Sequence, residues 1–388
     1  MGRPVYLDHA ATTYVIPEVV EAMLPYFAQQ WGNPSSVYSL GRVARRAIDD
    51  ARDSVADVLG CRANEVLFTG GGSESDNLAI KGVALRQGSR GGQLITTRIE
   101  HHAVLHSFQW LERELGFEVT YLDVDADGRV DPADVAANLK PTTQLVSIML
   151  ANNEIGVVQP IAEITSLCRA REVLFHTDAV QAVGALDLDV GRLGVDLLSM
   201  SGHKFYGPKG VGVLYVRRGT SLQPIIHGGG QERGVRSGTE NVAAIVGFAH
   251  ALRLAHQEMQ SRVGHARRLR DRLTEGILGS ISGARLTGHP EHRLPNNASF
   301  VFDGADGESI LLNLDQYEIC ASSGSACTSG SMEISHVLKA LRLPHSMAAG
   351  SLRLTTGICN TDEDVDRVLT VLPEIVGRVR ELAPVGTG

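Results

Sequence analysis

A lysine stands inside a Gly/Ser turn, Ser201-Gly202-His203-Lys204, directly after a run of apolar residues typical of a buried strand. An amine in such a place can form a Schiff base with an aldehyde when burial and a neighbouring cation lower its pKa. Ser201 and His203 add polar groups that could bind a phosphate beside it. An exposed loop lysine is the ordinary use of this position, so the role of Lys204 depends on which other groups converge on it.

A glycine-rich turn, GGGSES over residues 70–75, follows an earlier predicted strand and opens a predicted helix. Its backbone N–H groups and the helix dipole could face an anion. The turn lacks the Gly-Lys-Ser/Thr of a Walker A loop and the GxGxxG of a dinucleotide site. It could therefore bind a single phosphate. The alternative is a plain strand-to-helix turn capped by Ser73.

Asp178 ends another predicted strand, and Gln181 follows three residues later. A carboxylate beside an aromatic ring nitrogen stabilises its protonated form, which makes the ring a stronger electron sink. Gln181 could donate to a phenolate oxygen on the same ring. Asp178 could equally be a helix N-cap, and both roles are compatible with its position.

A histidine group, Ile99-Glu100-His101-His102-Ala103, follows the second predicted strand. His101 could lie over a flat ring and carry protons near neutral pH. His102 and His106 have the i, i+4 spacing of a metal pair. There is no HExxH frame and no clear third ligand, so we expect no metal site.

Five cysteines are scattered through the chain without any CxxC, which argues against a disulfide framework or a zinc cluster. Cys327 lies in ASSGSACTSG, surrounded almost completely by small residues, as suits a nucleophile that must travel. A structural loop thiol is the alternative for Cys327, and we expect Cys320, in a more apolar stretch, to be one.

Arg353 alternates with apolar residues in a predicted strand, Ser351-Leu352-Arg353-Leu354. Its guanidinium offers a rigid fork for a carboxylate, and a surface salt bridge is the alternative. Asn33, in GNPSS, could assist as a second carboxylate donor, although Asn-Pro also marks a simple turn.

Short apolar runs alternate with helical patterns through the first two thirds of the chain, which predicts an α/β fold with a mainly parallel seven-stranded sheet. The strands are expected at residues 65–69, 93–97, 118–122, 144–150, 173–176, 196–200 and 212–216, and the helices at 75–86, 103–115, 132–139 and 161–171. Ligands of such sheets bind at the carboxyl ends of the strands, where most of the polar groups above are found.

The pattern changes near residue 241 to a smaller α+β unit. It begins with one long helix over residues 242–278, whose charged run 267–272 is expected to face solvent. Strands at 298–302 and 351–355 and helices at 308–316, 335–341 and 363–382 follow, the last capped by Thr361. A length of 388 residues also favours two domains.

These motifs together resemble the cysteine desulfurases of the NifS/IscS type, class V aminotransferase-like members of the fold-type I pyridoxal-phosphate (PLP) enzymes, including the DndA-like members. The resemblance covers nearly the whole chain, through the segments LDHAATT, GNPSS, ESDNLAIKG, EHHAVL, NNEIGVVQ, HTDAVQAVG, SGHKFYGPKGVG, HGGGQERGVRSGT and SSGSACTSG. It implies a large PLP-binding domain over residues 15–255. The smaller domain, residues 1–14 and 256–388, carries the catalytic cysteine loop.

The resemblance also implies a role for each site residue. Lys204 links covalently to PLP, His101 stacks on the ring and moves protons, and Cys327 receives the substrate sulfur as a persulfide. A transient iron–sulfur contact of Cys327 is conceivable. Arg353 and Asn33 hold the substrate carboxylate. The residues implied to contact the ring or its phosphate are Asp178, Asn153, Gln181, Gly72, Ser73, Ser201, His203 and, from a partner subunit, Thr239.

The implied reaction removes sulfur from L-cysteine, leaves L-alanine and passes the sulfur to an acceptor protein. The acceptor could serve iron–sulfur assembly, tRNA thiolation or DNA phosphorothioation. The alternatives are a selenocysteine lyase, a related class V aminotransferase or a non-catalytic sulfur-relay scaffold. We expect Cys327 to move in order to act.

Bulk properties set the expected partners and location. A net charge of −8 gives no support to direct nucleic-acid binding. There is no apolar run of transmembrane length and no signal-peptide pattern at the start of the sequence. We expect a cytoplasmic protein that contacts no membrane, and the resemblance, through Thr239, implies a homodimer.

Overall fold

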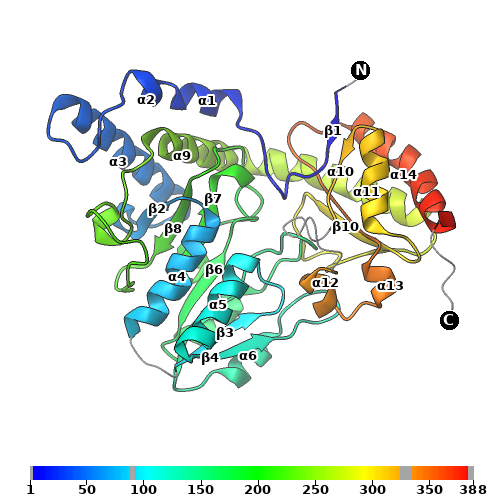
Figure 1. Cartoon of the computed structure of the whole chain (residues 1–388), viewed down its shortest axis with the longest axis horizontal. Coiled ribbons are helices and arrows are strands. Elements are labelled where there is room, and N and C mark those ends of the chain that lie inside the picture. The colour runs from blue at the N-terminus through cyan, green and yellow to red at the C-terminus, as the bar shows by residue number, and fades with distance from the viewer. Residues whose placement is uncertain (1–2, 88–91, 324–333, 383–388) are drawn as a thin grey trace.

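Seven strands form one sheet at the centre of the computed structural model, which describes residues 3–87, 92–323 and 334–382 (Figure 1). Their order is β2-β8-β7-β6-β5-β3-β4. All neighbouring pairs are parallel except those made by β8, which runs antiparallel to β2 and β7. The strands are β2 Val66–Thr69, β3 Gln93–Thr97, β4 Glu118–Leu122, β5 Thr143–Ser147, β6 Leu174–Asp178, β7 Leu197–Ser201 and β8 Gly212–Val216. The prediction of a mainly parallel seven-stranded sheet is confirmed.

Helices cover both faces of this sheet, and alternate strand residues point to opposite layers. Leu67, Leu94 and Leu197 pack on one side against α4 (Gly72–Gln87) and α5 (His102–Leu115). Phe68, Ile95 and Leu198 pack on the other side, whose helices are α3 Ser39–Leu59, α6 Pro132–Asn138, α7 Ile161–Arg169 and α9 Val242–Gln257. Because both faces are buried, the strands read as almost continuous apolar runs in the sequence.

A second core lies beside the large sheet. It packs the antiparallel sheet β12-β10-β9 and the parallel pair β1-β11 against three helices. The elements are β1 Val5–Tyr6, β9 Ala284–Leu286, β10 Asn297–Phe302, β11 Ile319–Cys320, β12 Ser351–Thr355, α10 Met259–Ser280, α11 Gly307–Gln316 and α14 Asp362–Leu382. The division into domains at residues 14/15 and 255/256 stays a prediction.

The helix expected over residues 242–278 is wrong as a single element. It is divided into α9 and α10 at Glu258, whose φ of −98° and ψ of 6° leave the helical region. No glycine or proline marks this break. Within the charged run, Arg270 is buried and donates to the carbonyl of Leu294, so it does not face solvent.

The helix predicted over residues 335–341 is present as α12 His336–Ala340. Further short helices were not predicted: α1 Pro17–Met23, α2 Pro25–Ala28, α8 Val190–Leu193 and α13 His345–Ala348, with 3-10 turns at Ala63–Glu65, Gly202–Lys204 and Glu232–Gly234. None of the helices in the described ranges combines the length and apolar character needed to span a membrane.

Gly212 lies where β8 is paired on both sides, opposite Thr69 of β2 and Ser201 of β7. A Cβ there would lie 2.6 Å from the carbonyl carbon of Gly71 and 2.7 Å from the carbonyl oxygen of Met200. We predict that Gly212→Ala costs about 1–3 kcal/mol of stability, because backbone atoms cannot yield cheaply. Thermal melting measures the effect.

Gly264→Ala is the matched control, because Gly264 is an exposed position of α10 with open space around its missing Cβ. Alanine is favoured over glycine in a helix by up to about 1 kcal/mol, so this variant should melt at or above the wild-type temperature. Equal melting temperatures for the two variants would contradict the prediction.

Candidate active site

The carboxyl edge of the large sheet brings together the ends of β6 and β7 and the start of α5. Asp178 is the last residue of β6 and Ser201 the last of β7. Lys204 follows β7 in a single 3-10 turn, and His101 is the N-cap of α5. The polar motifs predicted at strand ends therefore meet at one edge.

Asp178 is a buried carboxylate that accepts a hydrogen bond from the backbone N–H of Val180 at 2.8 Å. Burial raises its pKa to about 6, while the Val180 bond and the charge of Lys204 oppose that rise. The group is therefore an anion at neutral pH, in a place where water does little to stabilise it. Such a carboxylate favours a cationic partner.

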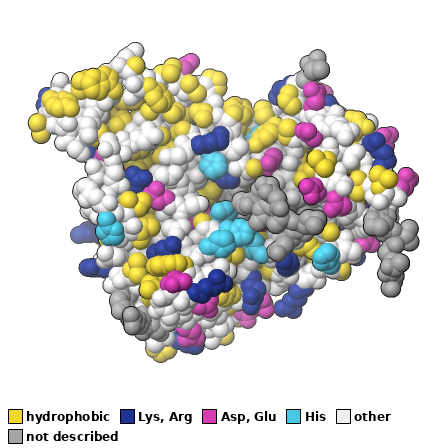
Figure 2. All heavy atoms as spheres, in the orientation of Figure 1, with side chains coloured by type: hydrophobic (Ala, Val, Ile, Leu, Met, Phe, Trp, Pro, Cys, Tyr) yellow, Lys and Arg dark blue, Asp and Glu magenta, His cyan; other side chains and the backbone are white. Residues whose placement is uncertain are grey.

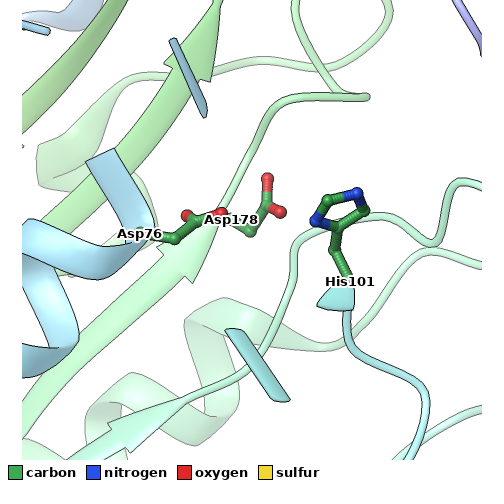
Figure 3. Close-up of side chains that lie close together, drawn as sticks. All are labelled: Asp76, His101 and Asp178. Carbon is green, nitrogen blue, oxygen red and sulfur yellow. The ribbon is translucent and has the colours of Figure 1, made fainter. Parts of the chain in front are cut away.

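Asp76 of α4 lies beside Asp178, although no sequence argument singled it out. Figure 3 shows Asp76, Asp178 and His101 facing one another, and one ligand atom from each lies within 4.8 Å of the other two. Two carboxylates and an imidazole at this spacing could also ligate a divalent cation. The expectation of no metal site stays a prediction.

His101 is held by its own helix, because its Nδ1 accepts a hydrogen bond from the backbone N–H of Ala103 at 3.1 Å. Burial, together with the charge of Lys204 and of neighbouring histidines, lowers its pKa to about 4. At neutral pH the ring is uncharged. With Nδ1 as an acceptor, it carries its proton on Nε2.

The N-terminal segment anchors Lys204 from outside the sheet. The amine donates to the carbonyl of Ala10 at 2.6 Å and to that of Ala11 at 2.8 Å, and Gln181 Nε2 donates to the Ala10 carbonyl at 2.9 Å. These acceptors are backbone atoms of small residues, so side-chain chemistry could not reveal them. Lys204 and Gln181 are thereby fixed to one short stretch of chain.

The glycine turn before α4 has geometry that only glycine allows. Gly71 has φ +147°, and a Cβ on Gly72 would lie 2.8 Å from Cγ2 of Val180 and 3.3 Å from Cβ of Ser201. The helix therefore starts close against Ser201, at the edge that holds Asp178. Ser73 is exposed at the start of α4.

Arg353 is a buried member of the site, with 2% of its surface exposed. Its Nη2 lies 2.8 Å from Oδ1 of Asp8, and its Nη1 donates to the carbonyl of Asn153 at 2.8 Å. Its Nε has no hydrogen-bond partner among the described residues. The alternative considered for Arg353 was a surface salt bridge. The salt bridge with Asp8 exists but involves a buried guanidinium, whose Nε remains available as a donor.

Three predicted residues lie in other surroundings. Asn33 is exposed, and its Oδ1 accepts from the N–H of Ser35 at 2.9 Å as part of a turn. Thr239 is exposed. His203 approaches Oγ1 of Thr12 at 3.1 Å, and burial, with Lys204 and Lys209, lowers its pKa to about 4. These contacts do not tie Asn33 or Thr239 to the central group.

Cys327 lies outside the described residues, but both flanks of its segment are placed. On one side, the carbonyl of Ser322 accepts from the N–H of Arg353 at 2.6 Å. On the other, Oγ of Ser335 donates to Oε2 of Glu154 at 2.5 Å, and burial raises the pKa of Glu154 to about 7. The segment therefore leaves and re-enters the described structure beside residues of the site.

Comparison with known proteins agrees with the family and the fold that the sequence motifs predict. Residues 5–368 match the aminotransferase class-V family model. The chain is 51% identical over 386 residues to a cysteine desulfurase IscS from Clostridium botulinum, covering 99% of this chain and 97% of the relative.

The chain belongs to the cysteine desulfurases. A solved NifS-like protein superposes with a TM-score of 0.91 at 39% identity, over 97% of this chain and all of the other. The structure of DndA from Streptomyces lividans gives 0.76 at 37% identity, over 90% and 99%. The predicted family and the fold are confirmed, and membership of aminotransferase class V implies PLP as the cofactor.

The residues at the sheet edge of this desulfurase fit PLP. Asp178 offers a buried anion for the protonated ring nitrogen, and His101 offers an uncharged ring. The glycine turn at the start of α4 leaves backbone space that a Cβ at Gly72 would fill, as close approach of a phosphate requires. Lys204 supplies the amine.

His176 lies beneath this edge on β6 and is fully buried. Its Nδ1 lies 2.8 Å from Oγ of Ser147 and its Nε2 3.0 Å from Oγ of Ser199. Burial lowers its pKa to about 3. The folded protein therefore excludes a proton that the unfolded chain binds below the ordinary histidine pKa.

This imbalance predicts a pH effect on stability. As the pH falls from about 6.5 toward 3, the unfolded state gains a proton at His176 and the folded state does not, a cost of about 2 kcal/mol at pH 5. We predict that the melting temperature of His176→Gln rises relative to wild type between pH 7.5 and pH 5. For the exposed His345→Gln the difference from wild type should stay constant, and a constant difference for both variants would exclude the effect.

Proposed function

We propose that this chain removes sulfur from L-cysteine with PLP bound at the carboxyl edge of the large sheet, and that the sulfur passes to Cys327. The observation that carries the proposal is the convergence of a buried anion, an uncharged imidazole and a lysine amine, from Asp178, His101 and Lys204. Each group supplies what the cofactor needs at a different position.

PLP, when bound, withdraws electrons from the substrate amino acid and so eases proton removal at its Cα. Asp178 would face the ring nitrogen and hold a proton there, and Gln181 would donate to the phenolate oxygen. His101 would lie over the ring, with its Nε2 proton toward the bound substrate. Lys204 would hold the cofactor until the substrate amine displaces it and could then carry protons.

Gly72, Ser73, Ser201 and His203 are the proposed phosphate ligands. The close approach of Gly72 to Ser201 supports this set, because it leaves backbone N–H groups and a hydroxyl near one point. His203 is uncharged at neutral pH, so it would act as a hydrogen-bond partner of the phosphate and not as a cation. Asn153 is proposed to contact the ring. It lies in the loop after β5, and its carbonyl accepts from Arg353 of β12.

Arg353 is proposed to bind the substrate carboxylate, with Asn33 as a second donor. The buried Nε of Arg353 without a partner supports this role, since such a donor is costly unless a ligand satisfies it. Asp8 already pairs with Nη2 and so fixes the plane of the guanidinium.

Cys327 is proposed as the acceptor of sulfur. Its thiolate would attack the substrate sulfur, so that a sulfur–sulfur bond forms as the carbon–sulfur bond breaks. The freed electron pair and a proton complete alanine, and the enzyme keeps a persulfide. Both flanks of the segment, at Ser322 and Ser335, support this role because they are tied to Arg353 and Glu154.

The remaining cysteines support Cys327 by contrast. Burial raises the pKa of each described thiol, to about 12 for Cys61 and Cys168 and to a smaller extent for Cys320 and Cys359. A thiol that stays protonated is a poor nucleophile.

A homodimer is proposed on the strength of one apolar surface. Figure 2 shows hydrophobic side chains gathered over the end of the molecule formed by α1–α3. Eight large apolar side chains between residues 14 and 43 are exposed, namely Tyr14, Val20, Leu24, Phe27, Trp31, Val37, Tyr38 and Val43. Such a patch is typical of a protein interface, and a second copy would also let the exposed Thr239 reach the partner's phosphate.

The sulfur acceptor is proposed to be a protein. The relatives named IscS favour iron–sulfur assembly, tRNA thiolation stays open, and the lower identity to DndA keeps DNA phosphorothioation as the less favoured route. The net charge of −8 argues that any nucleic acid is reached through the acceptor. A cytoplasmic location stays a prediction.

Lys204→Ala tests the cofactor assignment. The variant should lose the visible absorption band of lysine-bound PLP after gel filtration, because no amine remains to hold it covalently. Lys209→Ala, at an exposed lysine in the following turn, is the matched control and should keep the band. A normal band in Lys204→Ala would contradict the assignment.

Cys327→Ser tests the sulfur transfer. The variant should keep the PLP band but form alanine from L-cysteine at least about a hundredfold more slowly, because the nucleophile is gone. Cys320→Ser should keep both properties. Full activity of Cys327→Ser toward L-cysteine would refute the persulfide step, and activity toward selenocysteine alone would favour the lyase alternative.

A further inference from the structure

Asp76 is an acidic side chain that the proposed reaction leaves without a role. It lies in the second turn of α4, is 1% exposed, and its Oδ1 has no hydrogen-bond partner among the described residues. An unpaired buried carboxylate oxygen is costly, so a native protein keeps one only where something compensates. Figure 3 shows the group directed toward Asp178.

Within the described part of the chain, the groups that act on the Asp76 carboxyl include no cation that would balance its charge. The basic side chain of His176 lies beside it, with Nε2 3.7 Å from Oδ1, and burial keeps that ring neutral by lowering its pKa to about 3. The acidic groups that face it are Asp178 and Glu100, and a hydroxyl, that of Ser199, donates to it. Lys204 lies on the Asp178 side of the pair and favours the charged form of Asp178.

Two buried carboxyl groups this close cannot both be charged at low cost, since the second charge would meet both desolvation and repulsion. Burial and the charge of Asp178 raise the pKa of Asp76 well above its ordinary value. A neutral Asp76 has one O–H to donate, and the anionic Asp178 lies beside it as an acceptor, with one carboxylate oxygen of each within 4.8 Å of the other.

We propose that Asp76 is a positioning residue, which shares one proton with Asp178 and so fixes the orientation and basicity of the carboxylate that faces the ring nitrogen of PLP. The inference rests on the proposed function in its reference to PLP. The proton shared by Asp76 and Asp178 does not depend on bound PLP, because both carboxyl groups belong to this chain. Ser199, His176 and Ser147 extend the contact into the sheet and hold Asp76 in place.

The consequence is a balance between two effects. A hydrogen bond from neutral Asp76 weakens the hold of Asp178 on a proton at the ring nitrogen, while it keeps Asp178 in the geometry that binds the ring. We expect the orientation of Asp178 to be the larger effect, so loss of the donor should loosen PLP and replacement of the acid by an amide donor should largely keep PLP bound.

The first experiment titrates dialysed wild-type protein, Asp76→Asn and Asp76→Ala with PLP and follows absorbance. Asparagine offers an N–H donor of nearly the same shape and alanine offers none. We expect affinity within about threefold of wild type for Asp76→Asn and at least about tenfold weaker for Asp76→Ala, since a donor to a charged group is worth about 1.5–3 kcal/mol. Equal affinities for the two variants would overturn the proposal.

The second experiment needs no cofactor and works even if Asp76→Ala fails to fold. Folded Asp76 keeps its proton above the pH at which the unfolded residue loses it, so its contribution to stability falls as the pH rises from about 4 toward the folded pKa. The apo form of Asp76→Asn lacks that loss. Its melting temperature should rise relative to wild type between pH 5 and pH 8.

Asp127→Asn, at an exposed loop carboxylate, is the control and should show a constant difference from wild type. A constant difference for Asp76→Asn as well would overturn the shared proton. Wild-type protein that binds no PLP would defeat the proposed function instead, and the melting series would still decide the state of Asp76.

Discussion

The active edge of the molecule depends on one negative charge kept away from water at the end of β6. Among the described residues, one backbone N–H, that of Val180, donates to Asp178, and little of its side chain is exposed. Its charge is therefore stabilised mainly by neighbouring side chains and by bound groups. The neighbouring groups follow from this constraint. His101 and His176 are held neutral, Asp76 faces the same carboxylate, and the lysine amine lies close enough to favour the charged form. A second uncompensated charge here would raise the cost of folding by several kcal/mol.

The first dozen residues join the two cores through that same site. β1 pairs with β11 in the smaller sheet, Asp8 binds Arg353 of β12, and the carbonyls of Ala10 and Ala11 accept from Lys204 of the large sheet. The guanidinium and the amine are thus held by one short segment, the first at Asp8 and the second at Ala10 and Ala11 in the turn that follows. A change in the relative position of the two cores would shift both the Arg353 guanidinium and the Lys204 amine, because each is held by the N-terminal segment as well as by its own core.

Much of the fold could be predicted from the sequence because strands buried on both faces of a sheet are almost continuous apolar runs. The bounds of β3, β4, β8 and β12 agree with the predicted runs, and the motifs at strand ends meet as expected. The break at Glu258 could not be predicted, since no helix-breaking residue marks it in the sequence. Asp76 escaped notice because an acidic residue in the first turns of a helix is ordinarily explained by the helix dipole. The pairing of Arg353 with Asp8 joins opposite ends of the chain, a contact that no local pattern reports.

The raised pKa values of the four described thiols bear on where sulfur can be transferred, rather than on catalysis. Four cysteines lie in surroundings that keep them protonated, and the described ones form no disulfide with one another. A persulfide formed on the same chain would find no thiolate there to which its outer sulfur could migrate. The raised pKa values of these thiols therefore oppose exchange of sulfur within the chain, and a more acidic thiol on another protein would be the better acceptor.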